Sequence, residues 1–396
     1  MNMTGRAGEY FAHAWRGKKR IDVAFTLIVL AMTLLLVFLP TGYEKKASSS
    51  ERAKALVLET DDAMVRNFGI VMQGEQLVKV RILGGAFKGL EADANNILYG
   101  KADLDKLFAP GDVALAVIDP AAAEGAPPVI TLMDHYRLGL EGAMVIAFFA
   151  LLLLYGGWTG ARSAAAFLFA VAAIWKVLIP AFLSGVPPVL ASLGTVAVLS
   201  GVIILLVAGF TRTGAAAILG SLAGTAVSAA AALMLAEPYH VNGAVRPFAE
   251  TLLYGGFDHL NLTQIFLAGT FLASSGAFID LAMDIAASME EVHAKRPELG
   301  FKELVFSGLT VGRKIIGTET TTLLLAYTGG YTSLLMVFMA QGVPMANMFN
   351  ITYVSSEVFH TMIGSLGLLT IAPFTALAAG ALFSARRALA PGAKLS

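Results

Sequence analysis

The chain has 396 residues, of which 57% are hydrophobic and 14% are charged. Soluble domains carry about 25% charged residues, so this composition excludes an ordinary soluble protein and predicts a polytopic membrane protein. Lysine plus arginine and aspartate plus glutamate number 28 each, so the net charge is zero and gives no reason to expect a nucleic-acid partner. The absence of cysteine excludes disulfides, thiolate metal sites and cysteine nucleophiles.

The first apolar run, residues 21–40, follows a basic stretch over residues 16–20. Basic residues beside a span favour the cytoplasmic side, so residues 1–40 are predicted to form a cytoplasmic N-terminus and a first transmembrane helix. A cleaved signal peptide is the alternative. The run approaches the roughly 20 residues that span a bilayer, and no A-x-A-like site follows it, which favours an uncleaved span.

Residues 41–138 have the composition of a water-soluble domain. Alternating patterns over residues 77–82 and 113–118 predict strands, and residues 55–58 and 129–133 are weaker strand candidates. Several short strands in so short a segment favour a small antiparallel barrel of the OB or lipoyl kind, held outside the cytoplasm. Its role as a binding module or as a spacer stays open.

The rest of the chain, residues 139–396, is predicted to be a transmembrane bundle. With the first run it gives about eight spans, so the expected fold is an all-α membrane bundle with the barrel inserted after the first span. Basic residues of alternate loops and of the C-terminal tail then lie on the cytoplasmic side, together with both termini. The further apolar runs are residues 139–156, 164–183, 189–209, 214–235, 263–287, 318–340 and 353–384.

Two segments of this bundle differ from simple spans. Residues 238–262 mix apolar and charged side chains, including Arg246, and are expected to lie along the outer interface or to fold partly back into the membrane. Residues 301–316 alternate apolar and charged positions in the manner of an amphipathic helix. We expect this second segment to lie on the cytoplasmic face as an elbow between two spans.

Two acids lie inside a predicted span, at Asp280 and Asp284. Their spacing places both carboxylates on one helix face, together with Gly276 and other small residues. A charged side chain at the centre of a bilayer costs about 2.5–3.5 kcal/mol on insertion scales. Such a face is therefore predicted to meet other helices or a water-filled cavity.

A second cluster follows the elbow, where Arg313 and Lys314 precede Glu319 and a run of threonines. Threonine hydroxyls can donate hydrogen bonds to a buried carboxylate, so this cluster and the acids at 280 and 284 are candidates for a proton or cation relay. The alternative is an arginine–carboxylate pair that only fixes the elbow. The threonines assigned to the relay are Thr318, Thr321 and Thr322.

Secondary candidates lie in the last span, where Glu357 and His360 form a pair that can titrate near neutral pH. A surface pair at a helix start explains these two residues equally well. Small residues at close spacing predict helix-packing faces. The residues assigned to packing are Gly220, Gly224, Ser228, Gly276, Gly364 and Gly367.

Motifs of enzymes are missing from the sequence. It has no G-x-S-x-G elbow, no P-loop and no zinc-spaced histidine pair. An enzyme is therefore not expected, and neither a metal nor another cofactor is predicted.

The sequence resembles the YibE/F-like family of bacterial multi-span membrane proteins. Residues 276–283 are similar to its G-A-x-x-D-x-A-M block, residues 307–327 contain its S-G, G-R, G-T, T-L and A-Y landmarks, and residues 364–367 match its G-S-x-G. The family pattern has Asp where Lys314 stands, Ser at Asp284 and Asn at Thr321. The resemblance therefore implies that Asp280 and Arg313 form the better-supported pair. It also implies a bacterial inner membrane and suggests transport.

These observations favour a secondary transporter or exporter coupled to a proton or cation gradient, with Asp280 as the titrating group and Arg313, Glu319 and Thr322 as its partners. The main alternative is a non-transporting scaffold or receptor whose outer barrel binds a partner. An ion channel is a third possibility, and it requires a symmetric oligomer. The expected partners are the lipid bilayer, a small solute or ion, and either a second copy or a paralogous chain.

Overall fold

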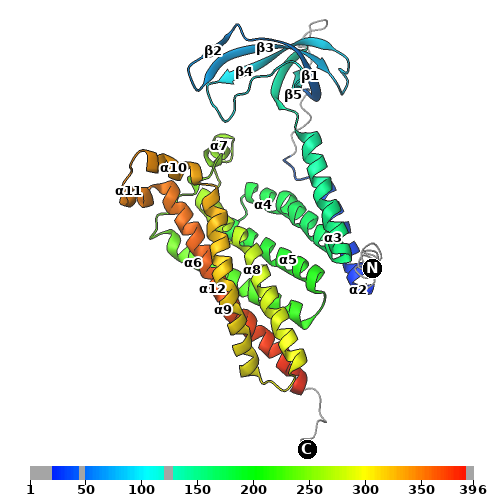
Figure 1. Ribbon diagram of the computed structural model, residues 1–396, viewed down its shortest axis with the longest axis vertical. Coiled ribbons are helices and arrows are strands. Elements are labelled where there is room, and N and C mark those ends of the chain that lie inside the picture. The colour runs from blue at the N-terminus through cyan, green and yellow to red at the C-terminus, as the bar shows by residue number, and fades with distance from the viewer. Residues whose placement is uncertain (1–19, 44–49, 120–127, 389–396) are drawn as a thin grey trace, which may run out of the picture. The chain divides into compact units, whose positions relative to one another are not determined.

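The computed structural model describes residues 20–43, 50–119 and 128–388, with side chains to residue 384. The chain divides into two compact units (Figure 1). One unit is Gly42–Leu151, and the other combines Met1–Thr41 with Leu152–Ser396. Most of the basic stretch before the first apolar run, and the end of the C-terminal tail, lie outside the described residues.

The first unit contains a small β-barrel, as the sequence predicted. Its strands follow the order β1-β5-β6-β4-β3, and a further pairing of β1 with β3 closes the ring. All pairs are antiparallel except β4 with β6, and this order agrees with the OB type. Short β2 pairs with β3 alone. The strands are β1 Glu51–Asp61, β2 Val65–Asn67, β3 Met72–Ile82, β4 Glu91–Tyr99, β5 Val113–Asp119 and β6 Val129–His135.

The four expected strand segments are confirmed as parts of β1, β3, β5 and β6, whereas β4 was missed. The reason lies in the side chains that β4 turns inward. Ala94 and Asn96 are small or polar, and of the inward positions only Leu98 is a large apolar residue. A strand with such an interior face lacks the alternation of large apolar residues that identifies a strand in sequence.

A buried polar group fixes the loop between β4 and β5 to the barrel. Gln76 is fully buried, and its side-chain amide donates to Phe108 O (2.9 Å) and to Asp62 Oδ1 (2.8 Å). Its carbonyl oxygen accepts hydrogen bonds from Phe108 N–H and from Asn96 Nδ2, both at 3.0 Å. Because all the hydrogen-bonding capacity of the Gln76 side chain is used, its burial carries little desolvation penalty.

The second unit is helical. Among the described residues, six helices are long and apolar enough to cross a membrane, or up to seven if the bent pair α9 and α10 counts as one span. The helices are α2 Arg20–Phe38, α3 Leu138–Ala173, η1 Ile174–Leu178, α4 Ile179–Leu183, α5 Pro188–Ala208, α6 Arg212–Ala236, η2 Gly243–Val245, α7 Ala249–Tyr254, α8 Leu262–Lys295, α9 Phe301–Gly329, α10 Thr332–Ala340, α11 Met345–Asn350 and α12 Thr352–Ala388.

The expected count of eight spans is not confirmed. Residues 139–156 and 164–183 were expected as separate spans, and the helical stretch Leu138–Leu183 in which they lie is made of two helices that meet at Gly157. The backbone departs from helical geometry at Gly157, with φ 52° and ψ −126°. Gly160 lies so close to Leu152 O that a Cβ atom would overlap it, whereas residues eight apart in one straight helix are about 12 Å apart. The chain therefore turns sharply at Gly157, where glycine allows the positive φ.

The expected cytoplasmic elbow is not a separate helix. Residues 301–316 are the first half of α9, which continues without a break to Gly329. Gly308 and Gly312 lie against α12, where Cβ atoms built on them would meet the methyl groups of Ala376 and Ala372. The alternating pattern is therefore that of a helix with one side packed on α12 and a polar opposite side.

Small residues hold α6 and α12 close together, and both helices run side by side with α8 and α9 in Figure 1. A Cβ atom at Gly220 would lie 2.8 Å from Thr375 Cβ and 2.9 Å from its Cα. Gly224 faces Ile371 in the same way, and Ser228 Oγ donates to Ile363 O at 3.2 Å. These three residues therefore lie in the interface that their spacing suggested.

Of the other three packing candidates, two lie in helix contacts and one does not. Gly364 lies against Ser274, and Gly367 against Phe278 and the Ser228 Cβ, so both allow α12 to approach its neighbours closely. Gly276 has no heavy atom within 4 Å of its Cβ position. The structure therefore does not place Gly276 in a helix contact, because its side of α8 faces outward.

We predict that Gly220→Ala destabilises the bundle by about 1–3 kcal/mol, since the added methyl group overlaps the backbone of α12. Gly276→Ala is the matched control and should leave stability unchanged or raise it by up to about 1 kcal/mol through helix propensity. The measurement is the free energy of unfolding in a detergent titration. Equal stabilities of the two variants would contradict the close approach of α6 and α12.

Candidate functional site

The acids of α8 lie on its outward face. Asp280 and Asp284 are exposed, and among the described residues neither forms an ion pair or a hydrogen bond. The opposite face of α8 is packed into the core through Phe271, Phe278 and Leu281. The sequence therefore placed the two carboxylates on one face correctly, but that face meets no other part of the described chain.

The predicted relay is not assembled within the chain. Among the described residues, neither Arg313 nor Lys314 nor Glu319 forms an ion pair. The threonine hydroxyls donate to carbonyls of their own helix instead: Thr318 to Ile315 O (2.8 Å), Thr321 to Gly317 O (2.9 Å) and Thr322 to Thr318 O (3.0 Å). A helical threonine can satisfy its hydroxyl in this local way, so a run of threonines does not by itself imply a polar path.

A cluster of ionisable side chains does form around Glu357 and His360, the secondary candidates from the sequence. Arg246, in the loop between η2 and α7, lies against Glu357 and His360 on α12. Arg246 Nη2 lies 2.8 Å from His360 Nδ1. Glu357 Oε2 lies 3.4 Å from Arg246 Nη1, and Glu357 Oε1 lies 3.7 Å from His360 Nδ1. We call these three side chains the charged triad.

Aromatic side chains enclose the triad. Arg246 Nη1 donates to Tyr331 Oη at 2.9 Å, and the guanidinium lies 5.1 Å from the centre of the Phe266 ring. Tyr327 stacks on His360 with ring centres 4.3 Å apart, and its hydroxyl lies 3.0 Å from Ser274 Oγ. The triad therefore joins α8, α9 and α12 to the segment over residues 238–262, with Glu357 and His360 largely buried and Arg246 36% exposed.

The proton on His360 can be assigned from its neighbour. A guanidinium has no acceptor, so His360 Nδ1 must accept the hydrogen bond from Arg246. The neutral ring then carries its proton on Nε2, which is buried and without a hydrogen-bond partner. In this arrangement His360 is uncharged, and the positive charge of Arg246 is balanced by Glu357 alone.

Local backbone features bring Arg246 to this position. Asn242 and Asn261 cap η2 and α8 by accepting hydrogen bonds from Ala244 N–H and Gln264 N–H. Between them, Gly243 lies so close to the backbone of Leu262 that a Cβ atom would overlap it. Only glycine allows this contact, which seats the outer segment on the start of α8.

The break between α9 and α10 places a further side chain, Tyr331, beside the charged triad. The two helices are bent by 68° at residues 330–331, where Gly329 and Gly330 lower helix propensity. Tyr331 lies at the bend, and its hydroxyl meets the triad there. The sequence had predicted one straight span over residues 318–340, and the structure instead breaks it beside the charged cluster.

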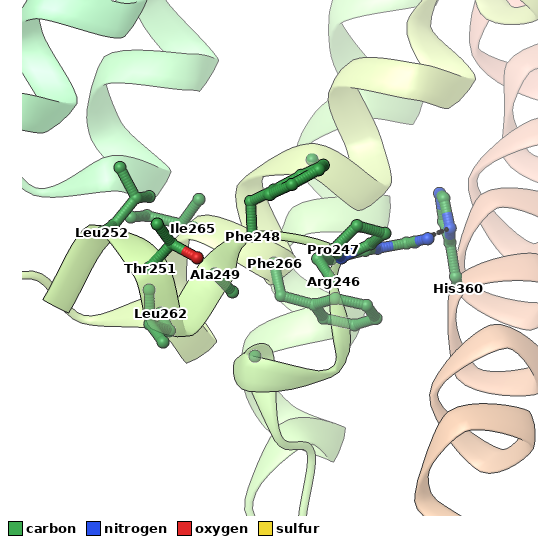
Figure 2. A pocket seen from close by; sticks show the side chains of 12 residues that line it. Arg246, Pro247, Phe248, Ala249, Thr251, Leu252, Leu262, Ile265, Phe266 and His360 are labelled. Carbon is green, nitrogen blue, oxygen red and sulfur yellow. Dashed lines mark hydrogen bonds between the residues drawn. The ribbon is translucent and has the colours of Figure 1, made fainter. Parts of the chain in front are cut away.

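Two cavities border the triad. Figure 2 shows the first, a space of about 610 Å³ whose wall includes Arg246, Phe248 and His360. The second, of about 270 Å³, is lined by Tyr331 and Glu357 among largely apolar residues of α9 to α12. Among the described residues, no group of three or more histidine, aspartate or glutamate side chains is arranged to hold a metal ion.

The helical bundle matches a known protein family. The model of the YibE/F-like protein family matches residues 144–385. The chain belongs to the YibE/F-like family. No curated protein and no solved structure matches it.

In this YibE/F-like protein, the matched region contains the whole charged triad and excludes the barrel. Family membership and the apolar helices together indicate a membrane protein.

Sequence reasoning missed Arg246 as the partner of Glu357 and His360. The sequence did contain an indication of this role. The loops expected on the outer side hold almost no lysine or arginine, and Arg246 is the main exception. A cation in a loop that is expected on the outer side departs from the usual charge bias and therefore needs a local reason. The acid of α12 is that reason, but the two residues lie far apart in sequence.

We predict that Arg246→Gln in this YibE/F-like protein lowers stability by about 1–3 kcal/mol, because Glu357, only 13% exposed, loses its counter-charge. The double variant Arg246→Gln with Glu357→Gln should recover part of this loss, which a double-mutant cycle measures. Arg313→Gln, which removes an arginine without an ion pair, is the control. Additive effects of the two substitutions at 246 and 357 would argue against the pair.

Proposed function

We propose that this protein is a proton-coupled secondary transporter of the bacterial inner membrane, with the charged triad at its centre. The observation that carries the proposal is a partly buried set of ionisable side chains beside a broken helix, bordered by two cavities. Ionisable residues within membrane helices are costly and commonly mark substrate or proton paths.

The broken helix supports transport in particular. Transporters commonly bind substrates and coupling ions at discontinuous helices, whose freed backbone groups are tolerated where they line a cavity. The bend between α9 and α10 has this form, and Tyr331 connects it to Arg246. A change in the triad can therefore alter the angle or position of α10.

The chemistry of His360 supports coupling to protons. When His360 takes up a proton, Nδ1 becomes a donor and can no longer accept from Arg246. The ring then favours Glu357, whose Oε1 is 3.7 Å from Nδ1. Protonation thus exchanges an Arg246–His360 contact for a His360–Glu357 contact, and this gives the site two arrangements that a proton can select.

This proposal moves the coupling role from Asp280 to the triad. Asp280 has no counter-charge or hydrogen-bond donor among the described residues, whereas Glu357 has a counter-charge in Arg246 and His360 accepts a hydrogen bond from it. In the proposed topology the two termini are cytoplasmic and the barrel is extracytoplasmic, in keeping with the charge bias of the loops.

The exposed acids of α8 favour a second candidate, in which the protein assembles with a second copy or a paralogous chain. Asp280 and Asp284 lie outward on an apolar span, where contact with lipid costs about 2.5–3.5 kcal/mol for each charge. A covering chain would remove this cost. An oligomeric channel would use the same surface, whereas the scaffold or receptor alternative would bind its partner through the barrel.

Proton movement in reconstituted vesicles tests the transport proposal. Purified protein is placed in vesicles with a trapped pH-sensitive dye, and a panel of organic anions, cations and neutral solutes is added singly. We expect at least one solute to change the internal pH, and Glu357→Gln and His360→Gln to slow this change at least tenfold.

Asp280→Asn is the comparison variant and should retain the rate within about twofold. A wild-type rate in Glu357→Gln would remove the triad from coupling, and selective loss in Asp280→Asn would return that role to α8. If no solute of the panel moves protons, transport itself is refuted for these classes and the assembly candidate takes precedence.

A further inference from the structure

We infer that the larger cavity binds an amphipathic anion, a molecule with one carboxylate or phosphate group and an apolar body. This inference rests on the proposed function, since it names the substrate class of the same site. The cavity lies between the outer segment and the start of α8, with Arg246 and His360 at its polar end.

The size and lining of the cavity set the shape of the ligand. Its volume of about 610 Å³ lies within the usual range for sites of small organic molecules. Apart from Arg246, His360 and Thr251, the lining is made of apolar residues and glycines. Such a wall favours an aliphatic or aromatic body over a sugar or a peptide. The apolar side chains are Pro247, Phe248, Ala249, Leu252, Leu262, Ile265 and Phe266.

Arg246 selects the charge of the head group. Its Nη atoms contact Tyr331, Glu357 and His360, and a guanidinium has five N–H donors in a planar fork, so donors remain for a ligand. Carboxylate and phosphate groups match this fork in a bidentate manner. A cationic head group would find no acceptor on the guanidinium.

Charge balance links the anion to a proton. With His360 neutral, Arg246 and Glu357 cancel, so an added anion would leave one uncompensated negative charge in an apolar setting. One proton taken up by Glu357 or His360 restores neutrality. The other titratable groups that face them, Tyr327 and Tyr331, are uncharged near neutral pH. The site is therefore suited to take up one proton with each anion.

Phe248 gives the cavity wall a strained element. Its backbone has φ 62° in the left-handed region, and its side chain is 79% exposed. A bulky residue in this conformation is an outlier, and such backbone strain persists only where the surroundings maintain it. In Figure 2 it stands beside Pro247 and Arg246 on the cavity wall, where its ring can cover an apolar ligand.

Cysteine protection tests the inference cleanly, because the chain has no native cysteine. Gly269→Cys places a thiol on the cavity wall, at a position with open space for a side chain. Gly276→Cys, on the same helix, has the same open space and does not line the cavity. Labelling by N-ethylmaleimide in detergent is followed by mass spectrometry, with decanoate and decanol as probes.

We expect decanoate to slow labelling of Gly269→Cys at least fivefold, more strongly at pH 6 than at pH 8, and to leave Gly276→Cys unaffected. Decanol should protect little, and Arg246→Gln should abolish the protection. An unchanged labelling rate of Gly276→Cys in the Arg246→Gln background shows that the fold persists. Equal protection by decanol, protection that survives Arg246→Gln, or no protection would overturn the inference.

The same labelling in nanodiscs identifies the source of the anion. Protection by phosphatidylglycerol but not by phosphatidylcholine would support the site and assign it to a membrane lipid, whereas protection by decanoate alone would support a free solute. Because labelling needs no gradient, protection without proton flux would retain the site and refute transport. Flux without protection would retain transport and refute the anionic substrate.

Discussion

A carboxylate inside an apolar helix bundle needs a counter-charge, and in this protein Arg246 supplies it to Glu357. The guanidinium does not come from a neighbouring helix but from a short loop outside the helices, so the loop must be held at a fixed place. Gly243 and the asparagine caps on either side of it provide that hold. Tyr331 at the bend and His360 on α12 contact the same guanidinium, so this one arginine joins the loop, the bend and α12.

The bundle meets this constraint with helices that differ in their packing. α6 and α12 approach through glycine and serine, so their axes can lie close together without large interdigitating side chains. Close packing of this kind fixes α12, and therefore Glu357 and His360, to within a narrow range of positions. α9 and α10 form the opposite case, since the chain bends by 68° between them instead of continuing as one packed helix.

The two faces of α8 lie in different surroundings. Its buried face carries large apolar side chains into the core, while the outward face carries Gly276, Asp280 and Asp284. The family block over residues 276–283 includes residues from both the buried and the outward face of α8. Its sequence pattern therefore does not distinguish core residues from exposed ones. Burial within the fold makes that distinction.

Sequence alone determined the features that depend on composition and local period. The apolar runs, the barrel with four of its strands, the family, and the shared face of Asp280 and Asp284 were all readable, because each follows from the spacing of residues along one element. The close approach of α6 and α12 was indicated by small residues at regular spacing.

The tertiary structure decided which ionisable groups meet. Arg246 and Glu357 are far apart in the chain, and no local pattern ties them, so their pairing follows only from how the outer segment seats on α8 beside α12. The same holds for Arg313 and the threonines, whose polar groups suggest a relay but are satisfied locally or left facing outward. The partners of a side chain depend on how different elements pack against each other. The periodicity of residues within one element carries no information about that packing.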